Sequence, residues 1–355
     1  MKKKFTAIDL FCGAGGLTLG LKKAGFRTLV GVEINENIAK TYKANNRKTK
    51  TLVKDISKVC GKEILKEAKI RKIDLIAGCP PCQGFSQLTE KWKKEDPRNG
   101  LVLEMARLVE EIKPKIVMME NVPGIVTKGK IILQTFVEKL QSLGYVINYG
   151  VLQMADYGVP QSRRRFVLLA GRGFEVKLPN PTHTWKKPNA KNNLKPWVTI
   201  DKIIRSMPKP VTLSYAVRNG GPQKFNWHIV RDLKPISIDR LKALSEGYDR
   251  RSLPEHLRPD CHKGTNEGFN NVYGRMEWNK VSPTITSGCT TPCMGRFGHP
   301  EALRTISIRE AALIQTFPKN FRFIAQHMDT ACDLVGNALP CEFAWKVAKS
   351  CYKAL

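Results

Sequence analysis

The stretch Ile73–Ser86 reads IDLIAGCPPCQGFS, and the rest of the chain is organised around it. Its largely apolar run Ile73–Ala77 predicts a buried strand. The two prolines that follow fix φ twice and remove two N–H donors, so neither a helix nor a strand can continue. Cys82 is therefore expected on a stiff turn at the carboxyl end of a strand, where open parallel sheets collect ligands. A thiol held in this way suits a nucleophile.

Three other interpretations of this turn stay open on the segment alone. The spacing Cys79-x-x-Cys82 is also that of a thioredoxin-like redox motif. The same two thiols could form half of a zinc site. The third alternative is a structural turn that carries a buried cysteine.

Charge and composition narrow the class of protein. The 355 residues include 60 Lys and Arg against 31 Asp and Glu, which gives a net charge of +29. A net positive charge of this size favours the binding of polyanions, with nucleic acid as the first candidate. Ten scattered cysteines lack the density of a disulfide scaffold and fit a reducing cytoplasm. Asp9 interrupts the first apolar run, and no stretch approaches the ~20 apolar residues of a membrane helix, so we expect neither secretion nor membrane insertion.

Strand and helix patterns alternate through the first half of the chain. This alternation predicts an α/β fold with a doubly wound, mostly parallel sheet. Strands are predicted at 6–11, 28–34, 51–53, 73–77, 116–119, 146–153 and 166–170, and helices end at 24 or span 36–45, 62–69, 101–112 and 131–143.

The alternation stops near Gly173, and Pro179-Asn180-Pro181 is a natural boundary. We therefore predict a first domain over residues 1–178 and a smaller, irregular domain over 179–303. Residues 304–355 are predicted to return and complete the first domain. Within them, Ser307 and Glu310 have the spacing of a capping box, and the last helix should pack back on the first domain.

Three successive strand ends offer groups that suit an adenosine ligand. The loop Phe11-x-Gly13-x-Gly15-Gly16 allows close backbone approach at a helix N-terminus. Glu33 ends the second strand, where a carboxylate can accept from both ribose hydroxyls. Asp55 follows the third, where it can accept from an adenine amino group. The alternative for each acid is a solvated loop carboxylate.

Further polar groups are expected at the same edge of the sheet. Glu120 ends the strand beside the cysteine strand, and Gln161-Ser162-Arg163-Arg164-Arg165 precedes another. A thiol, a carboxyl group and fixed guanidinium groups would then share one pocket with the adenosine ligand. The alternatives are a pairing of Glu120 with one of the many lysines and surface phosphate contacts for Arg163 and Arg165.

Taken in order, these motifs resemble those of the DNA (cytosine-5-)-methyltransferase family of prokaryotic type, across the whole chain. Departures are slight: Leu313 stands where members often carry Arg, and Leu339 where Val is usual. The motifs that carry the resemblance are Asp9-Leu10-Phe11-Cys12-Gly13-Ala14-Gly15-Gly16, Gly78-Cys79-Pro80-Pro81-Cys82-Gln83-Gly84-Phe85-Ser86, Glu120-Asn121-Val122, Gln161-x-Arg163-x-Arg165, Arg309-Glu310-Ala311-Ala312-x-x-Gln315-x-Phe317-Pro318 and Gly336-Asn337-Ala338.

The resemblance implies methyl transfer from S-adenosylmethionine to carbon 5 of cytosine in a specific sequence of double-stranded DNA. The base would be flipped out of the duplex and attacked at carbon 6 by the Cys82 thiolate. Glu120 would give a proton or a strong hydrogen bond to ring nitrogen 3. Arg165 and Arg163 would hold the ring carbonyl, and Asn121 would fix the proline turn. The implied cofactor pocket consists of Phe11, Cys12, Gly13, Gly15, Gly16, Leu17, Glu33, Ile34, Asp55, Ile56, Pro81, Leu101 and Asn337. No metal is implied.

The resemblance also implies partners and leaves two alternatives. Residues 179–303 take the place of the family's target recognition domain, and Gln87–Asn99 resembles a loop that closes over the flipped base. The implied enzyme is a cytoplasmic, nucleoid-associated monomer on DNA, with a cognate restriction endonuclease as a further partner. One alternative is a silent member that only binds DNA, which the intact Cys82 and Glu120 disfavour. The other is a tRNA methyltransferase, which Gly84-Phe85-Ser86 resembles less.

Overall fold

The computed structural model describes residues 4–81, 100–186, 193–264 and 271–355, and these residues form two compact units. The first contains Met1–Tyr157, Arg164–Thr182 and Leu339–Leu355, and the second contains Gly158–Arg163 and His183–Ala338. The second unit thus takes up residues 304–338, which we had assigned to the return segment, and leaves only the last helix to the first unit. The functional domains themselves remain a prediction.

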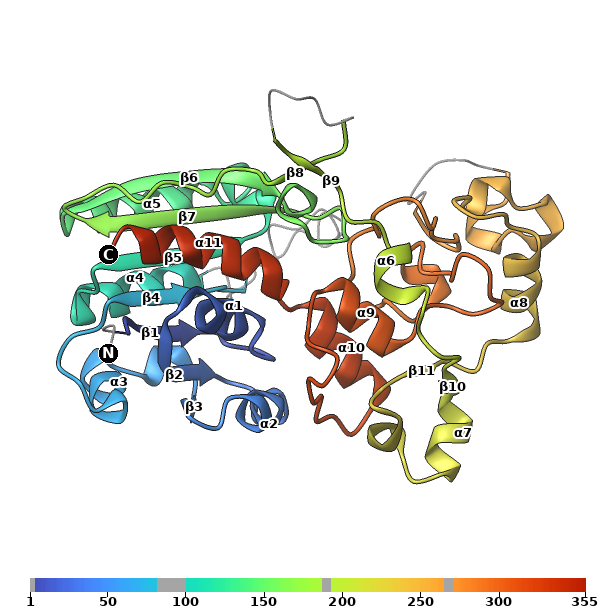
Figure 1. Ribbon diagram of the computed structural model, residues 1–355, viewed down its shortest axis with the longest axis horizontal. Coiled ribbons are helices and arrows are strands. Elements are labelled where there is room, and N and C mark those ends of the chain that lie inside the picture. The colour runs from blue at the N-terminus through green and yellow to red at the C-terminus, as the bar shows by residue number, and fades with distance from the viewer. Residues whose placement is uncertain (1–3, 82–99, 187–192, 265–270) are drawn as a thin grey trace. The chain divides into compact units, whose positions relative to one another are not determined.

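The first unit is built on a sheet that, within the described residues, has seven strands (Figure 1). Neighbouring strands from β3 to β5 are parallel, whereas β7 runs antiparallel to both β5 and β6. The predicted doubly wound, mostly parallel fold is confirmed. In spatial order the strands are β3 (Lys50–Val53), β2 (Arg27–Glu33), β1 (Thr6–Leu10), β4 (Leu75–Gly78), β5 (Ile116–Asn121), β7 (Arg164–Arg172) and β6 (Tyr145–Gln153).

Helices cover both faces of this sheet because its strands are apolar on both sides. Ile8 and Leu10 of β1 join a core with α3, α4 and α5. Asp9, which points to the opposite face, contacts α1, and a Cβ at Gly31 of β2 would meet Tyr42 of α2. No described helix is long and apolar enough to cross a bilayer. The helices are α1 (Gly16–Ala24), α2 (Glu36–Asn45), α3 (Gly61–Ala68), α4 (Leu101–Ile112), α5 (Lys130–Ser142) and α11 (Cys341–Lys353).

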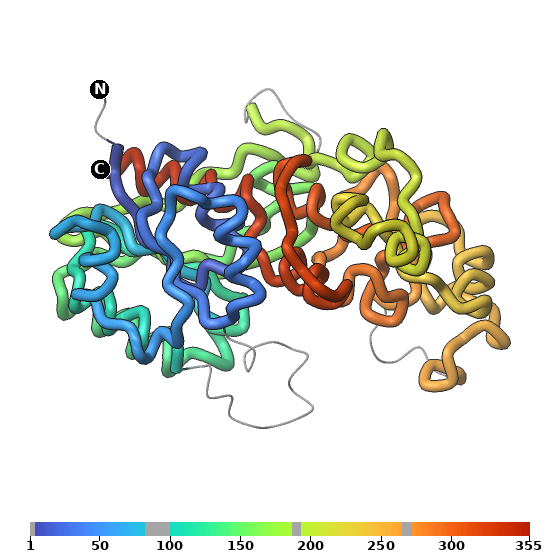
Figure 2. Tube along the Cα trace, turned by 90° about the horizontal axis from the view of Figure 1, so that it is seen from below, coloured from blue at the N-terminus to red at the C-terminus, as the bar shows by residue number. Residues whose placement is uncertain are grey.

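The C-terminal helix α11 returns to the first unit, as the sequence predicted, and lies along α1 (Figures 1 and 2). The two helices touch so closely that a Cβ at Gly20 would lie 2.4 Å from the Cβ of Ala344. The ring of Tyr352 then packs edge-on against Phe5 and Phe26, at centroid distances of 5.2 and 5.4 Å. The end of the chain thereby stabilises its beginning.

The second unit has short elements and no extended sheet among its described residues. Its strands are two residues long, which agrees with the loss of α/β periodicity after Gly173. Its elements are β8 (His183–Thr184), β9 (Lys195–Pro196), α6 (Asp201–Ile204), β10 (Val211–Thr212), α7 (Leu213–Arg218), β11 (Ile229–Val230), α8 (Pro235–Lys242), α9 (Ile308–Ile314) and α10 (Met328–Gly336).

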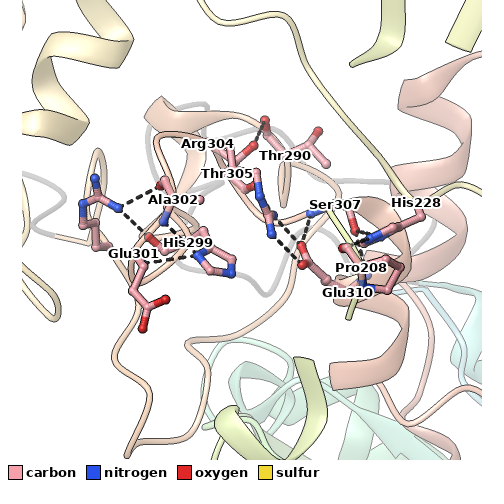
Figure 3. Close-up of polar contacts among 11 residues, drawn as sticks. Pro208, His228, Thr290, His299, Glu301, Ala302, Arg304, Thr305, Ser307 and Glu310 are labelled. Carbon is pink, nitrogen blue, oxygen red and sulfur yellow. Dashed lines mark hydrogen bonds and ion pairs between the residues drawn. The ribbon is translucent and has the colours of Figure 1, made fainter. Parts of the chain in front are cut away.

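Side chains that bind main-chain groups replace strand ladders in this unit. The buried Arg275 guanidinium donates to the carbonyl oxygens of Leu241, His299 and Ala302, at 2.7, 2.7 and 2.9 Å. His299 Nδ1 accepts from the N–H groups of Glu301 and Ala302 (Figure 3). Burial lowers the pKa of His299 to about 4, so the ring stays neutral at pH 7 and can keep accepting these bonds.

The start of α9 confirms the predicted capping box. Ser307 Oγ accepts from Glu310 N at 3.0 Å, and Glu310 Oε2 accepts from Ser307 N at 2.7 Å. The fully buried Glu310 is also paired with Arg304, at 2.7 and 2.8 Å, which holds its pKa below the usual range despite burial (Figure 3). Since Ser307 lies 2.9 Å from His228 Nδ1, and His228 Nε2 lies 2.7 Å from Pro208 O, the cap also anchors a distant loop.

Candidate active site

The loop between β1 and α1 has the conformation that its glycines allow. Gly13 and Gly15 have φ values of +51° and +99°, which side chains with a Cβ rarely adopt. A Cβ at Gly15 would also lie 3.1 Å from the ring of Tyr42, so the close approach to α2 requires glycine. Phe11 adopts a left-handed φ of 59° as well. The loop thus turns sharply and places its backbone directly before the N-terminus of α1.

A buried carboxyl group beneath this loop was not assigned a role from the sequence. Asp9 is fully buried, and its Oδ2 accepts from the Thr18 hydroxyl at 2.5 Å. The Tyr42 hydroxyl lies 2.7 Å from the same Thr18 oxygen. Because Thr18 gives its only proton to Asp9, Tyr42 is the donor in the second bond. Burial raises the pKa of Asp9 to about 7. The alternation of side chains along β1 would have been enough to predict that Asp9 faces α1. It could not predict that Thr18 and Tyr42 are its partners.

Glu33 ties the end of β2 to the glycine loop. Its Oε2 accepts from Gly13 N at 3.0 Å, and its Oε1 accepts from Asn35 N at 2.9 Å. Partial burial raises its pKa. The carboxylate still has acceptor capacity left, which a hydroxyl group of a ligand can use. The neighbouring Ile34 is 66% exposed and offers an apolar surface beside these acceptors.

Asp55 lies just after β3, the edge strand that pairs with β2. Its Oδ1 accepts from Ser57 N at 3.0 Å, and this backbone bond lowers its pKa, so the side chain is a carboxylate at pH 7. Two carboxyl groups, each oriented by backbone N–H donors, and one exposed apolar side chain therefore lie at two adjacent strand ends, next to the glycine loop. This arrangement fits an adenosine group, with ribose at Glu33, adenine at Asp55 and Ile34 against a ring face.

The other residues predicted for the cofactor fall into three groups. Phe11, Pro81 and Leu101 are half-buried and have side-chain surface to offer a ligand. The side chains of Cys12, Leu17 and Ile56 are buried, so these residues would offer mainly their backbone, as would the buried Gly16. Asn337 is exposed at the end of α10, in the second unit.

Glu120 and Arg165 form a nearly buried ion pair where β5 ends and β7 begins. Glu120 Oε1 lies 3.0 Å from Arg165 Nε, and the two side chains are only 11% and 15% exposed. The antiparallel pairing of β5 with β7, in which Asn121 faces Phe166, brings the arginine to the end of the glutamate strand. Arg165 Nη1 also donates to Arg164 O at 2.8 Å, which fixes the orientation of the guanidinium group.

The proline turn is held from the neighbouring strand. Asn121, which is 2% exposed, donates from Nδ2 to Pro80 O at 3.3 Å and accepts from Val122 N at 2.7 Å. Cys79 extends β4 opposite Glu120, and burial, with the Glu120 charge next, raises its pKa well above the usual range. Cys79 is therefore a neutral thiol at pH 7. Cys82 and the loop Gln87–Asn99 lie outside the described residues, so the thioredoxin and zinc interpretations of the cysteine pair are untested.

In the second unit, three of the quoted motifs meet in one buried network. Gln161 Oε1 accepts from Ile285 N at 2.9 Å, and Gln161 Nε2 donates to Gln315 Oε1 at 2.8 Å. Arg163 donates from Nη1 to Ile285 O at 2.7 Å and to Gly336 O at 3.4 Å. Arg163 is 6% exposed, so its guanidinium braces main-chain carbonyls. This bracing was not foreseen, because the partners are far apart in sequence.

Comparison with known proteins places the chain in a family. Residues 5–353 match the family model for C-5 cytosine-specific DNA methylase. The chain is 38% identical over 349 residues to the type II methylase M.HgiDII of Herpetosiphon aurantiacus, covering 97% of this chain and 94% of that protein. It is 32% identical to the type II methyltransferase M1.HphI of Haemophilus parahaemolyticus, covering 98% and 87%. The chain belongs to the C-5 cytosine-specific DNA methylase family. It is a DNA (cytosine-5-)-methyltransferase.

Solved structures of other proteins have the same fold as this chain. A protein described as a DNA modification methyltransferase encoded within an Escherichia coli prophage superposes with a TM-score of 0.73 at 24% identity, covering 99% of both chains. The Entamoeba histolytica methyltransferase EhMeth gives a TM-score of 0.64 at 18% identity, again over 99% of both chains. At these identities the likeness supports the fold alone.

Proposed function

We propose that this enzyme transfers the methyl group of S-adenosylmethionine to carbon 5 of a cytosine within a specific sequence of double-stranded DNA, through a covalent bond to Cys82. The observation that carries the proposal is the nearly buried Glu120–Arg165 pair, at 3.0 Å, beside the Pro80 turn that Asn121 holds. A carboxyl group and a fixed guanidinium next to a rigid turn are what addition to a cytosine ring requires.

The chemistry follows from the weak nucleophilicity of carbon 5. The Cys82 thiolate adds to carbon 6, while Glu120 donates a hydrogen bond or proton to ring nitrogen 3. The ring thereby becomes an enamine with electron density on carbon 5. S-adenosylmethionine would supply an electrophilic methyl group to carbon 5, and its S–CH3 bond would break to leave S-adenosylhomocysteine. A base then removes the carbon-5 proton, ring nitrogen 3 returns any proton it received to Glu120, and the bond between carbon 6 and Cys82 breaks. The thiolate and the methylated cytosine are thereby released.

The remaining residues position these groups. Arg165 holds Glu120 and reaches toward the ring carbonyl, while Asn121 fixes the turn that leads to Cys82. Arg163 acts from the second unit, where its guanidinium bonds to Ile285 and Gly336 hold the segment that carries it. Because each group is held by a second contact, little reorganisation is needed when the base arrives.

The cofactor residues would hold the adenosine part of S-adenosylmethionine. Glu33 accepts from the ribose hydroxyls, Asp55 accepts from the adenine amino group, and Ile34 contacts the adenine face. The turn at Gly13 and Gly15 supplies backbone contact to the rest of the cofactor. The orientation of Glu33 by Gly13 N and Asn35 N supports this assignment.

Access to carbon 6 requires that the cytosine leaves the stacked duplex, so the proposal includes base flipping. Residues 179–303 would read the target sequence, and Asn337 would complete the cofactor pocket. The type II names of the relatives support a role in restriction-modification, with an endonuclease that cuts the same sequence as a partner. The enzyme would act as a monomer in the cytoplasm, on the nucleoid.

Labelled methyl transfer tests this proposal. The wild-type protein, Cys82→Ser and Cys60→Ser are incubated with tritiated S-adenosylmethionine and either duplex DNA or tRNA. Cys60 is an exposed cysteine and serves as the matched control. We expect label in DNA with the wild type and Cys60→Ser, and none with Cys82→Ser, which should still bind DNA. Label in tRNA instead, or substantial turnover by Cys82→Ser, would contradict the proposal.

A further inference from the structure

A strongly basic groove lies beside β3, the edge strand of the sheet, next to the end of α2. Figure 1 labels β3 and α2. It encloses about 590 Å³ and is formed by the end of α2, the start of β3 and the end of α3. Five cationic side chains line it, against one acid, Glu67. The cations are Lys43, Arg47, Lys48, Lys50 and Lys69.

Most of this charge is not neutralised locally. Glu67 lies 3.2 Å from Lys50 and pairs with it. Within the described part of the chain, no ion pair involves Lys43, Arg47 or Lys48, and all three are exposed. Cations near a helix C-terminus complement the helix dipole, which accounts for Lys43 at the end of α2. Arg47 and Lys48 lie beyond that helix, so the dipole does not explain them.

The groove is separate from the cofactor residues. It involves Lys50, the first residue of β3, whereas Asp55 follows Val53 at the other end of the same strand. Glu33 pairs with Val53 and so belongs to that other end as well. The groove therefore lies at the amino end of the strand, and the predicted cofactor site at the carboxyl end.

The lining indicates which anion the groove suits. Among the described residues that line it, none is aromatic or apolar. A free nucleotide or single-stranded nucleic acid would normally be recognised by stacking of its bases on such side chains. Long, exposed lysines act as point charges and suit a row of phosphates that is read without its bases.

We propose that this groove binds the sugar-phosphate backbone of duplex DNA, as a second, sequence-independent contact apart from the active site. The inference rests on the proposed use of duplex DNA as substrate. A contact at the amino end of β3, away from the predicted cofactor site at its carboxyl end, would engage DNA outside the target sequence. It would raise the affinity for DNA of any sequence and would leave the methyl-transfer step unchanged.

The test compares two triple variants with the same loss of charge. The groove variant carries Lys43→Gln, Arg47→Gln and Lys48→Gln. The control carries Lys40→Gln, Lys62→Gln and Lys66→Gln, which are exposed residues of α2 and α3 outside the lining. Binding to a mixed-sequence duplex of about 40 base pairs is measured by fluorescence anisotropy over a range of salt concentrations. Calorimetry with S-adenosylmethionine checks that each variant keeps its fold.

The groove variant should bind the duplex about tenfold or more weakly at low salt, and its salt slope should fall by about 2–3 for three lost phosphate contacts. The control should stay within about twofold of the wild type. Equal losses in both variants would overturn the proposal, because total charge would then be the cause. Calorimetry with pyrophosphate is measured on the same three proteins. If the groove variant loses pyrophosphate binding but binds the duplex as the wild type does, the proposal is overturned too, and the groove binds a free phosphate compound. Failure of wild-type methyl transfer to DNA would count against the proposed function instead.

Discussion

Replacement of Arg165 by alanine should disable the active site while leaving the cofactor bound. The change would leave Glu120 nearly buried without its ion-pair partner. Removing one member of a buried pair typically destabilises a protein by about 3–5 kcal/mol. Because the two side chains are 15% and 11% exposed, water can still reach them, and we expect a loss of about 3 kcal/mol.

The loss of activity should exceed what instability alone would cause. Glu120 would no longer be oriented toward the ring, so we expect kcat to fall by about 100-fold or more, or about 2.7 kcal/mol of barrier. The KM for S-adenosylmethionine should stay nearly constant, since Glu33 and Asp55 are unchanged. Tritiated methyl transfer gives both constants, and urea unfolding gives the stability.

The neighbouring residue provides a matched control. Arg164 is exposed on the same strand and has the same charge, and its backbone oxygen, which accepts from Arg165 Nη1, is retained when the side chain becomes alanine. Arg164→Ala should therefore keep kcat within about threefold of the wild type. If Arg165→Ala behaves like Arg164→Ala in both assays, the ion pair has no role in catalysis and the reasoning fails.

Other substitutions test the remaining groups of the site. Glu33→Ala and Asp55→Ala should each weaken S-adenosylmethionine binding by roughly 1.5–3 kcal/mol in calorimetry, and unchanged affinity in both would refute the adenosine site. Burial raises the pKa of Asp9 from 3.8 to about 7. Between these two pKa values the folded protein holds a proton that the unfolded chain releases. As the pH rises from about 4 to 7, the free energy of unfolding should therefore fall, by up to about 4 kcal/mol. Asp9→Asn should flatten this slope in urea titrations, and an unaltered slope would count against it. Cys79→Ala should keep most activity, because a neutral thiol is a weak hydrogen-bond donor; loss of activity together with bound zinc would restore the metal interpretation.

Local sequence signals predicted much of the first unit. The bounds of α2 and α4 agree with the prediction, because α2 begins after the Asn35 cap and α4 has a clear apolar stripe that is buried. The antiparallel direction of β7 was not predicted, since apolar alternation does not encode the direction of a strand. The second unit gave no pattern because its elements are short and depend on distant contacts, such as those of Arg275 with Leu241 and His299.

The candidate site was predictable where a rule about strand ends applies. Glu33, Asp55 and Glu120 could be placed because side chains at the carboxyl ends of parallel strands collect at one edge. The chain of hydrogen bonds from Tyr42 through Thr18 to Asp9 could not, because it depends on how two helices pack on the sheet. The contact of Arg163 with a carbonyl 122 residues away was equally out of reach of local patterns.

In the proposed mechanism, catalysis passes through a covalent bond between Cys82 and carbon 6 of the cytosine. A duplex in which every cytosine is replaced by 5-fluorocytosine tests it without knowledge of the target sequence. Fluorine at carbon 5 cannot leave as a proton does, so the final elimination should fail and the covalent complex should persist. We expect a denaturation-resistant adduct, formed in the presence of S-adenosylmethionine, which mass spectrometry maps to Cys82. An adduct on another residue, or none from a preparation that methylates ordinary DNA, would contradict it.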